Sequence, residues 1–428
     1  MIADRSQYDL FVLLRIAALA RRRIVLAVVG AGLIGGLFGA AYLWVLRGVT
    51  DVIGAGHVGG WMHVPLLVGV GLVVALLVRW LGAPDDVELL VGNIHVLGGP
   101  REVRGLRSLI PASLLCVGVG GPLGPEAPLV TATGTFGSLL GHRQRMSPNE
   151  VRMIAITGMA AGFTVLFGAP LGSALFALEI LHRRGMEYYE ALMPSLVGAL
   201  VGFAVAAVAR VVGLEPVWHF PPIRVLTPGD FGWAIAAGVI GAIVAVLFTW
   251  LTIGLRHAVA LIPPSLRPAL GGLVIGLGAL ATPYVLTNGE QQINDLLDHR
   301  VVVGTLVVAA IAKLCSAAVG VVTGFRGGFI IPLFFIGFCL GRLTEGHLPG
   351  GNSMVFAAAL MVACNVGVTK TPLGSTLVVT EMAGFTILPT TLIAAMVSLV
   401  LTSEVGLIHS QQRRLHVDDV GQPIGAGT

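Results

Sequence analysis

The chain has little charge for its length. Of its 428 residues, 11% are charged, against about 25% in ordinary soluble domains. Apolar residues make up 55% of the sequence, and the mean hydropathy is +0.90. This balance excludes an ordinary water-soluble protein and indicates one whose partner is the lipid bilayer.

Cysteines and recognisable catalytic motifs are also scarce. The four cysteines lie singly in apolar stretches, with no CxxC or Cys/His spacing, and are expected to be buried packing residues: Cys116, Cys315, Cys339 and Cys364. The sequence has no HExxH, GxSxG, phosphate-binding loop or dinucleotide fingerprint. We therefore expect no metal, no cofactor and no enzyme activity.

The positive charge lies in short clusters beside apolar runs. The net charge is +4, but it does not form one basic face, so we expect no nucleic-acid partner. Arginines at 21–23 precede the apolar run Ile24 to Leu46, which is long enough to cross a bilayer. Because basic residues favour the inner side, we expect both termini in the cytoplasm and the protein in the inner (plasma) membrane. Residues 1–23 are predicted to form an amphipathic segment on that surface.

Two copies of one Gly/Pro pattern divide the chain into halves. Gly120, Gly124, Pro128 and Gly137 recur as Gly324, Gly328, Pro332 and Gly341, and the PLGS sequence at 170–173 with Glu179 recurs at 372–375 with Glu381. Matching breaks in apolar segments are typical of transporters built from inverted repeats around a central site. We predict an all-α polytopic membrane protein with repeats at 24–212 and 231–408, a connecting loop at 213–230, and a short cytoplasmic tail at 409–428.

Glu126 lies inside the first interruption, between two prolines. Pro125 and Pro128 favour a helix start here, and the free N–H groups of a helix start bind anions. A carboxylate in that turn can occupy the anion position itself, and its protonation would free the position. A glutamate that merely caps an exposed helix is the alternative, but ionisable residues inside membrane segments usually serve transport.

The second interruption, at 324–332, keeps the glycines and proline of the first and has Ile330 in place of Glu126. It therefore offers backbone donors without a competing acid, and we expect the two interruptions to lie side by side. Arg326 would either raise the local positive potential or extend to the membrane surface.

These motifs resemble those of the CLC chloride channels and proton-coupled anion exchangers, in a divergent bacterial form. Residues 124–128 (GPEAP) resemble the family's G(K/R)EGP, residues 328–332 (GFIIP) its GxFxP, and residues 167–179 and 370–382 its paired APLxGxxxxxE helices. The resemblance implies a homodimer with one anion pathway per subunit and Glu126 as the proton-accepting gate. It also implies an anion site formed by Gly124, Ala127, Gly328, Phe329 and Ile330.

Several positions depart from the family pattern. Residues 80–84 (WLGAP) are the counterpart of GSGIP, so Leu81 replaces the central serine and only the backbone of Gly82 and Ala83 would face the anion. His409 would replace the central tyrosine near the end of the chain, where it either donates to the anion or faces the cytoplasm. Pro125 and Ala127 stand where the family has a basic residue and a glycine, and they should restrict the gate.

The inner proton-transfer glutamate of the exchangers corresponds to Ile180. Glu179 and Glu381 are then either buried, partnered glutamates at helix ends or, for Glu179, a substitute proton donor. We predict a passive channel or uniporter for an inorganic anion, chloride by default. A proton-coupled antiporter of chloride or fluoride is the alternative, and an intramembrane enzyme is a remote one.

Overall fold

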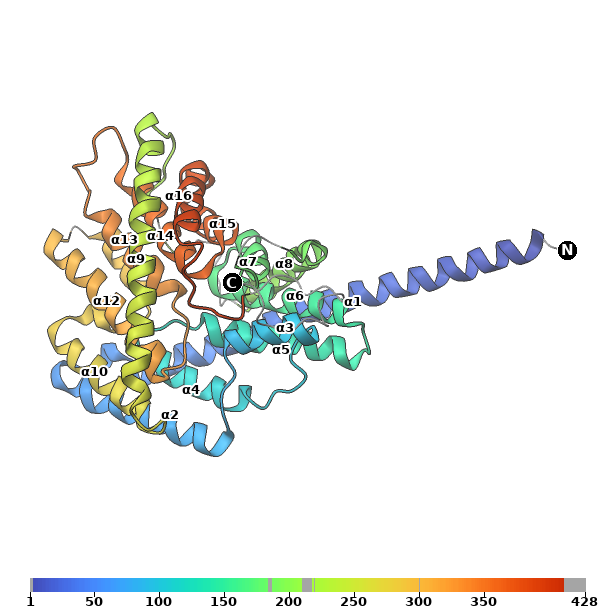
Figure 1. Ribbon diagram of the computed structural model, residues 1–428, viewed down its shortest axis with the longest axis horizontal. Coiled ribbons are helices and arrows are strands. Elements are labelled where there is room, and N and C mark those ends of the chain that lie inside the picture. The colour runs from blue at the N-terminus through green and yellow to red at the C-terminus, as the bar shows by residue number, and fades with distance from the viewer. Residues whose placement is uncertain (1–2, 184–186, 210–217, 219, 300, 412–428) are drawn as a thin grey trace.

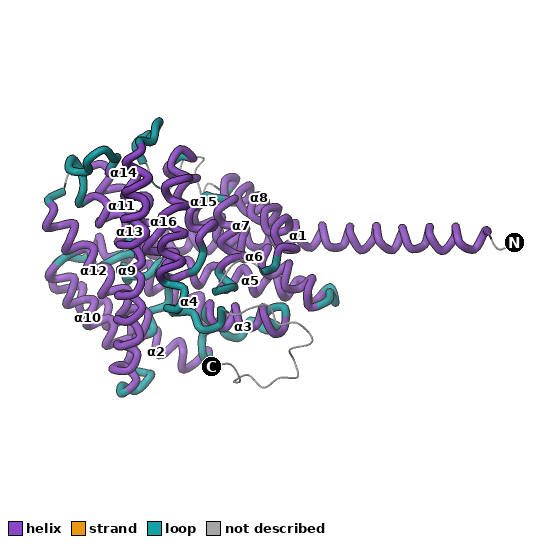
Figure 2. Tube along the Cα trace, turned by 45° about the horizontal axis from the view of Figure 1, so that its top comes forward, coloured by secondary structure: helices purple, strands orange, loops and turns teal. Residues whose placement is uncertain are grey.

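The computed structural model describes residues 3–183, 187–209, 218, 220–299 and 301–411, and among these all regular elements are helices. The helices gather into one body, and the N-terminal part of the first helix projects away from it (Figure 1). Figure 2 shows the same projection from another direction, with loops joining the ends of closely packed helices. The expected all-α fold is therefore confirmed.

The α-helices of the described residues fall into two sets of eight in chain order. The first set is α1 (Ala3–Ile53), α2 (His63–Leu81), α3 (Val87–Leu97), α4 (Leu106–Gly118), α5 (Glu126–Arg143), α6 (Pro148–Phe167), α7 (Pro170–Glu179) and α8 (Leu192–Val208). The second set is α9 (Pro228–Ala260), α10 (Arg267–Ala281), α11 (Glu290–Asp298), α12 (Val303–Thr323), α13 (Ile330–Arg342), α14 (Ser353–Thr369), α15 (Pro372–Ala383) and α16 (Leu388–Leu401). Short 3-10 helices occur at Ala55–His57, Gly60–Met62, Tyr189–Ala191, Pro283–Val285 and Phe385–Ile387.

The two sets pack in the same way. Helix α1 contacts α6 and α8, just as α9 contacts α14 and α16, and α5 lies on α6 as α13 lies on α14. The sets also meet each other, because α2 packs against α10 and α7 against α15. This arrangement agrees with a duplicated chain. The inverted orientation of the two repeats stays a prediction.

Within the described residues, six helical segments are long and apolar enough to cross a membrane, and they include parts of α1, α2, α6, α8, α9 and α12. Other apolar helices are too short. Helix α13 has 13 residues, which at 1.5 Å per residue cover about 20 Å of a hydrocarbon core about 30 Å thick. A helix of this length cannot cross the core by itself, which is consistent with the interruptions that the Gly/Pro pattern predicts.

The predicted segment boundaries differ from the helices at several places. Residues 3–53 form one helix, so the segment predicted for 1–23 continues into the first apolar run instead of ending before it. Helix α9 begins at Pro228, inside the predicted loop 213–230, because Thr227 and Asp230 form a capping box there. Residues 210–217 and 219 of that loop region, and 412–428 of the predicted tail, lie outside the described residues.

The repeated glycines at 137 and 341 allow two helix pairs to approach closely. A Cβ atom at Gly341 would lie 2.2 Å from the Cα of Ala357 in α14, and one at Gly137 would lie 2.5 Å from the carbonyl oxygen of Ile154 in α6. Side chains at these positions would separate α13 from α14 and α5 from α6. Since α5 and α13 begin at the two interruptions, these contacts also fix where the interruptions lie.

Gly341→Ala should therefore lower the free energy of unfolding by about 1–3 kcal/mol, because backbone atoms of α14 cannot yield to the added methyl group. Thermal unfolding of the detergent-solubilised protein measures the change. Gly232→Ala in α9 is the matched control, since a Cβ atom there meets no other atom within 4 Å. Equal unfolding temperatures for the two variants would contradict the close-packing role of Gly341.

Candidate functional site

The two interruptions are bonded directly to each other. The N–H of Gly124 donates to the carbonyl of Gly328 over 2.8 Å, and the N–H of Gly328 donates to the carbonyl of Gly124 over 2.6 Å. This antiparallel bridge joins residues that lie in different halves of the chain. The helix that follows each glycine, α5 after Gly124 and α13 after Gly328, therefore starts from one shared point.

Glu126 lies at this point with its side chain fully buried. Its Oε1 accepts a hydrogen bond of 2.6 Å from the backbone N–H of Ile331, in the first turn of α13. Its Oε2 has no hydrogen-bond partner among the described residues. The carboxylate of the first repeat thus occupies the helix start of the second, which is a position that favours an anion.

Glycine leaves space for this carboxylate. A Cβ atom at Gly124 would lie 2.1 Å from Glu126 Oε2, and one at Gly328 would lie 2.7 Å from the same atom. Any side chain at either position would push the carboxylate away from the Ile331 amide. The repeated glycines therefore serve both the backbone bridge and the space for Glu126.

A third segment holds the first interruption in place. The N–H of Thr287 donates to the carbonyl of Gly120 over 2.9 Å. Lys313 of α12, which is fully buried, donates from Nζ to the carbonyls of Leu286 and Thr287 over 2.7 and 2.6 Å. The lysine charge is thereby balanced by backbone dipoles, and it fixes the loop on which the 120–124 segment rests.

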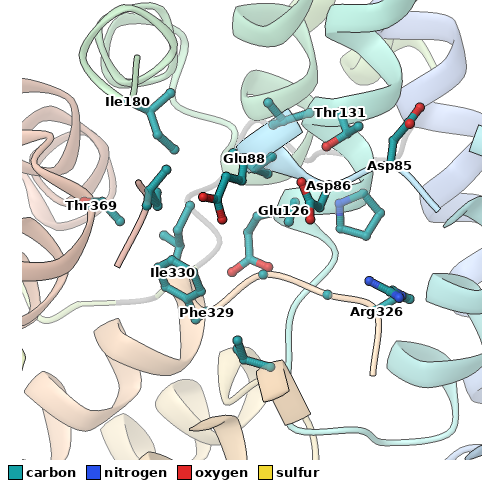
Figure 3. Close-up of a pocket in the computed structure, with 18 of the residues that line it drawn as sticks. Asp85, Asp86, Glu88, Glu126, Thr131, Ile180, Arg326, Phe329, Ile330 and Thr369 are labelled. Atoms are coloured by element: carbon teal, nitrogen blue, oxygen red, sulfur yellow. The ribbon is translucent and has the colours of Figure 1, made fainter. Parts of the chain in front are cut away.

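A cavity of about 180 Å³ adjoins Glu126. Five predicted site residues line it: Glu126, Ala127, Gly328, Phe329 and Ile330. Figure 3 shows Phe329 and Ile330 beside the Glu126 carboxylate and Ile180 farther away on the same side. Gly124 is not among the lining residues, and it contributes through its bridge to Gly328. The cavity is large enough for several water molecules or for one small hydrated ion.

The placement of Gly82 and Ala83 at this cavity was wrong. Both residues are exposed and do not line it, and Leu81 is exposed as well. Gly82 ends α2 with φ +97°, a backbone conformation that does not continue a helix. Helix α3 starts only at Val87, with Asp86 as its cap.

His409 is exposed and also lies outside the cavity lining, which corrects its predicted place at the anion. The preceding Leu407 and Ile408 are buried and line the cavity instead. An apolar pair fits a buried wall at lower free-energy cost than an imidazole does. The end of the described chain therefore closes the cavity with aliphatic side chains.

Residues without a predicted role also line the cavity. They are mainly polar and come from the start of α3, from α5 and from α9: Asp85, Asp86, Glu88, Thr131 and Arg256. The adjacent acids of the DDVE segment (85–88) were a visible signal, but first-turn acids are common in helices of every function. Arg326 lines the same cavity and is half-buried, so it lies close to the site.

Glu179 and Glu381 form two matching contacts between α7 and α15. The Glu179 carboxylate, which is buried, accepts from the N–H groups of Leu373 and Gly374 over 3.1 and 2.7 Å. The Glu381 carboxylate accepts from Leu171 and Gly172 over 3.3 and 2.5 Å. Each glutamate at the end of one helix thus caps the start of the other. Ile180 lines the Glu126 cavity beside this pair.

The described residues contain no group of three or more His, Cys, Asp or Glu side chains placed to hold a metal ion. The four carboxylates around the cavity are spread over its wall and do not converge on one point (Figure 3). The site consists of backbone N–H groups, carboxylates and aliphatic side chains. With these groups, another anion can take the place of a carboxylate at a helix start.

Comparison with known proteins identifies the family of the chain. Residues 70–403 match the family described as voltage gated chloride channel. The chain is 30% identical over 401 residues to the chloride/fluoride channel protein of Pseudomonas syringae pv. tomato, covering 89% of this chain and 85% of that protein. It is 30% identical over 303 residues to the voltage-gated ClC-type chloride channel ClcB of Citrobacter koseri, covering 68% and 71%. The chain belongs to the voltage gated chloride channel (CLC) family.

Solved structures of the family share the fold. A slow cyanobacterial Cl−/H+ antiporter superposes with a TM-score of 0.79 at 18% identity, over 90% of this chain and 95% of that one. A CLC-type fluoride/proton antiporter gives a TM-score of 0.75 at 20% identity, over 91% and 97%. At these identities the superposition establishes the architecture.

Replacing Glu179 by alanine should destabilise the protein by about 1–3 kcal/mol, because the buried amide of Gly374 and the partly buried amide of Leu373 lose their acceptor. Glu381→Ala should have a smaller effect on α7, because its bonds to Leu171 and Gly172 are more exposed. Thermal unfolding in detergent measures both changes. Glu102→Ala, which removes an exposed carboxylate paired with Arg104, should change the stability by less than about 0.5 kcal/mol. If Glu179→Ala behaved like this control, the capping role would be wrong.

Proposed function

We propose that this protein transports an inorganic anion, chloride by default, across the membrane through the cavity beside Glu126, and that Glu126 is its gate. The observation that carries the proposal is the hydrogen bond from the Ile331 amide to Glu126 Oε1. A carboxylate at a helix start occupies the place where a permeating anion would be stabilised. Membership of the CLC family supports the same function.

The gate works by exchange of one negative group for another. While Glu126 is charged, its carboxylate holds the α13 helix start and an anion is excluded by repulsion and by lack of space. A proton on Glu126 removes the charge and weakens its hydrogen bond to the Ile331 amide. The side chain can then leave, and an anion can bind the helix start through the backbone near Phe329 and Ile330, with Gly328 and Ala127 in the adjacent wall.

Passive conduction is the simpler form of this function. Ile180, which lines the cavity, cannot carry a proton, and the Glu179 carboxylate already accepts two amides of α15. Proton-coupled exchange is the second candidate. It is favoured by the two solved structures of the same fold, which are described as a Cl−/H+ antiporter and a fluoride/proton antiporter. The second of these also makes fluoride an alternative anion.

We further propose a homodimer in the plasma membrane with both termini in the cytoplasm. Exposed apolar side chains on α7, α8, α15 and α16 support a subunit contact on these helices, among them Leu171, Met193, Leu200, Leu373 and Val400. Helices α7 and α15 pack against each other, so a contact there would join both halves of each subunit. The arginines at 21–23 support the cytoplasmic position of the N-terminus.

Glu126→Gln should raise chloride flux in liposomes at neutral pH by about tenfold or more. The substitution removes the charged carboxylate, which occupies the anion position most of the time. The flux should also lose most of its dependence on pH. Glu102→Gln, at an exposed ion pair, is the control and should match the wild type. Unchanged flux and unchanged pH dependence in Glu126→Gln would show that Glu126 is not the gate.

If transport is passive, a chloride gradient should not drive protons through the wild-type protein. A pH indicator inside sealed liposomes, read with the membrane potential clamped, measures this directly. We expect proton movement no greater than in protein-free liposomes. Uphill proton movement that disappears in Glu126→Gln would show antiport instead of passive conduction. Glu126 would still be the gate.

A further inference from the structure

The anion cavity has more acidic side chains in its wall than the gate requires. Besides Glu126, it is lined by Asp85, Asp86 and Glu88, all from the start of α3. Negative groups beside an anion pathway oppose anion entry. We therefore expect the three carboxylates at one side of the cavity to affect anion entry.

Figure 3 separates these three acids by direction. The Asp85 carboxylate points away from Glu126. The Asp86 carboxylate lies near Glu126, but its Oδ1 is held by the N–H of Leu89 over 2.8 Å as the cap of α3. The Glu88 carboxylate points into the space between Glu126 and the side of Ile180 and Thr369. Of the three, Glu88 is the one whose carboxylate is drawn toward the side of Ile180 and Thr369.

Glu88 also lies at an opening of the cavity. Asp86 and Glu88 line both this cavity and an open groove along α3 whose other walls include Leu89, Asn93 and Val96. An anion that reached Glu126 through this groove would pass these two side chains. Glu88 is half-buried, and within the described part of the chain no hydrogen bond or ion pair holds its carboxylate. Its charge is therefore not balanced by a direct partner there.

A second group in the same wall points to a polar occupant. Thr131 of α5 is 1% exposed and lines the cavity, yet its hydroxyl has no hydrogen-bond partner in the described part of the chain. Buried hydroxyls are almost always satisfied by protein, water or ligand. An ion that keeps part of its water shell would supply that partner. The α3 side of the cavity thus has the features of an entry path.

The other charged groups of the cavity come from several elements. They are Asp85 and Asp86 before α3, Glu126 on α5, Arg256 on α9, and Arg326 before α13. Arg256 is exposed and can draw anions toward the cavity. The Glu88 charge opposes their passage along the α3 side of the cavity.

We propose that Glu88 is a second barrier, at the α3 side of the cavity, whose negative charge repels the anion. The proposal rests on anion transport through the Glu126 cavity, and it adds a barrier that Glu126 does not provide. Two carboxylates in series then control one path: Glu126 occupies the binding position, and Glu88 controls access to it. Loss of both charges should open the path further than loss of either one.

The test compares chloride flux in liposomes at neutral pH for the wild type, Glu88→Gln, Glu126→Gln and the double variant. Glu88→Gln should raise the flux by about threefold to tenfold, because a repelling charge near the path is removed. The double variant should conduct more than Glu126→Gln alone, because it lacks both charges. Glu88→Asp, which keeps the charge, should resemble the wild type.

Asp85→Asn is the matched control, because it removes a carboxylate of the same cavity that points away from Glu126. It should change the flux less than Glu88→Gln does. Flux in Glu88→Gln equal to or below that of the wild type, or flux in the double variant no greater than in Glu126→Gln, would overturn the second barrier. Neither result would affect the Glu126 gate. An unchanged Glu126→Gln variant would instead refute the function on which this inference rests.

Discussion

One hydrogen bond, from the Ile331 amide to the Glu126 carboxylate, is the contact on which the site depends. It needs a helix that starts inside the membrane, because only there are N–H groups free in a region without bulk water. It also needs the bridge between Gly124 and Gly328, which brings the acid of one repeat to the helix start of the other. The duplicated chain thus supplies the acid from one half and the amide from the other.

The protein uses the same pairing of carboxylate and helix start three times, with different consequences. At Glu179 and Glu381 each carboxylate accepts two amides, which makes these contacts suitable for joining α7 to α15 permanently. At Glu126, within the described residues, only Oε1 has a partner, and a cavity lies beside it. One hydrogen bond and adjoining space make this carboxylate easier to displace. The number of bonds and the free volume distinguish the two capping acids from the acid that we propose as a gate.

The motifs that join the repeats were predictable from the sequence. Glycine and proline act on the backbone of their own segment, so the repeated pattern at 120–137 and 324–341 is by itself enough to indicate interrupted helices. The α3 region was not predictable in the same way. The sequence WLGAPDD contains one glycine and one proline, and the choice between a helix start at Gly82 and one at Val87 depends on how the segment packs between α2 and α5. The same holds for the chain near 407–409, where burial selected the aliphatic pair over His409.

The sequence alone determined that this is a duplicated, all-helical membrane protein with an acid at one interrupted helix. Apolar composition, repeated Gly/Pro positions and a single unmatched glutamate are local properties of the chain, and local physics is enough to interpret them. The tertiary structure decided which groups surround that acid: the Ile331 amide, the side chains of Glu88 and Thr131, and the aliphatic wall at 407–408. These residues come from segments far apart in the chain, and only packing brings them to one cavity.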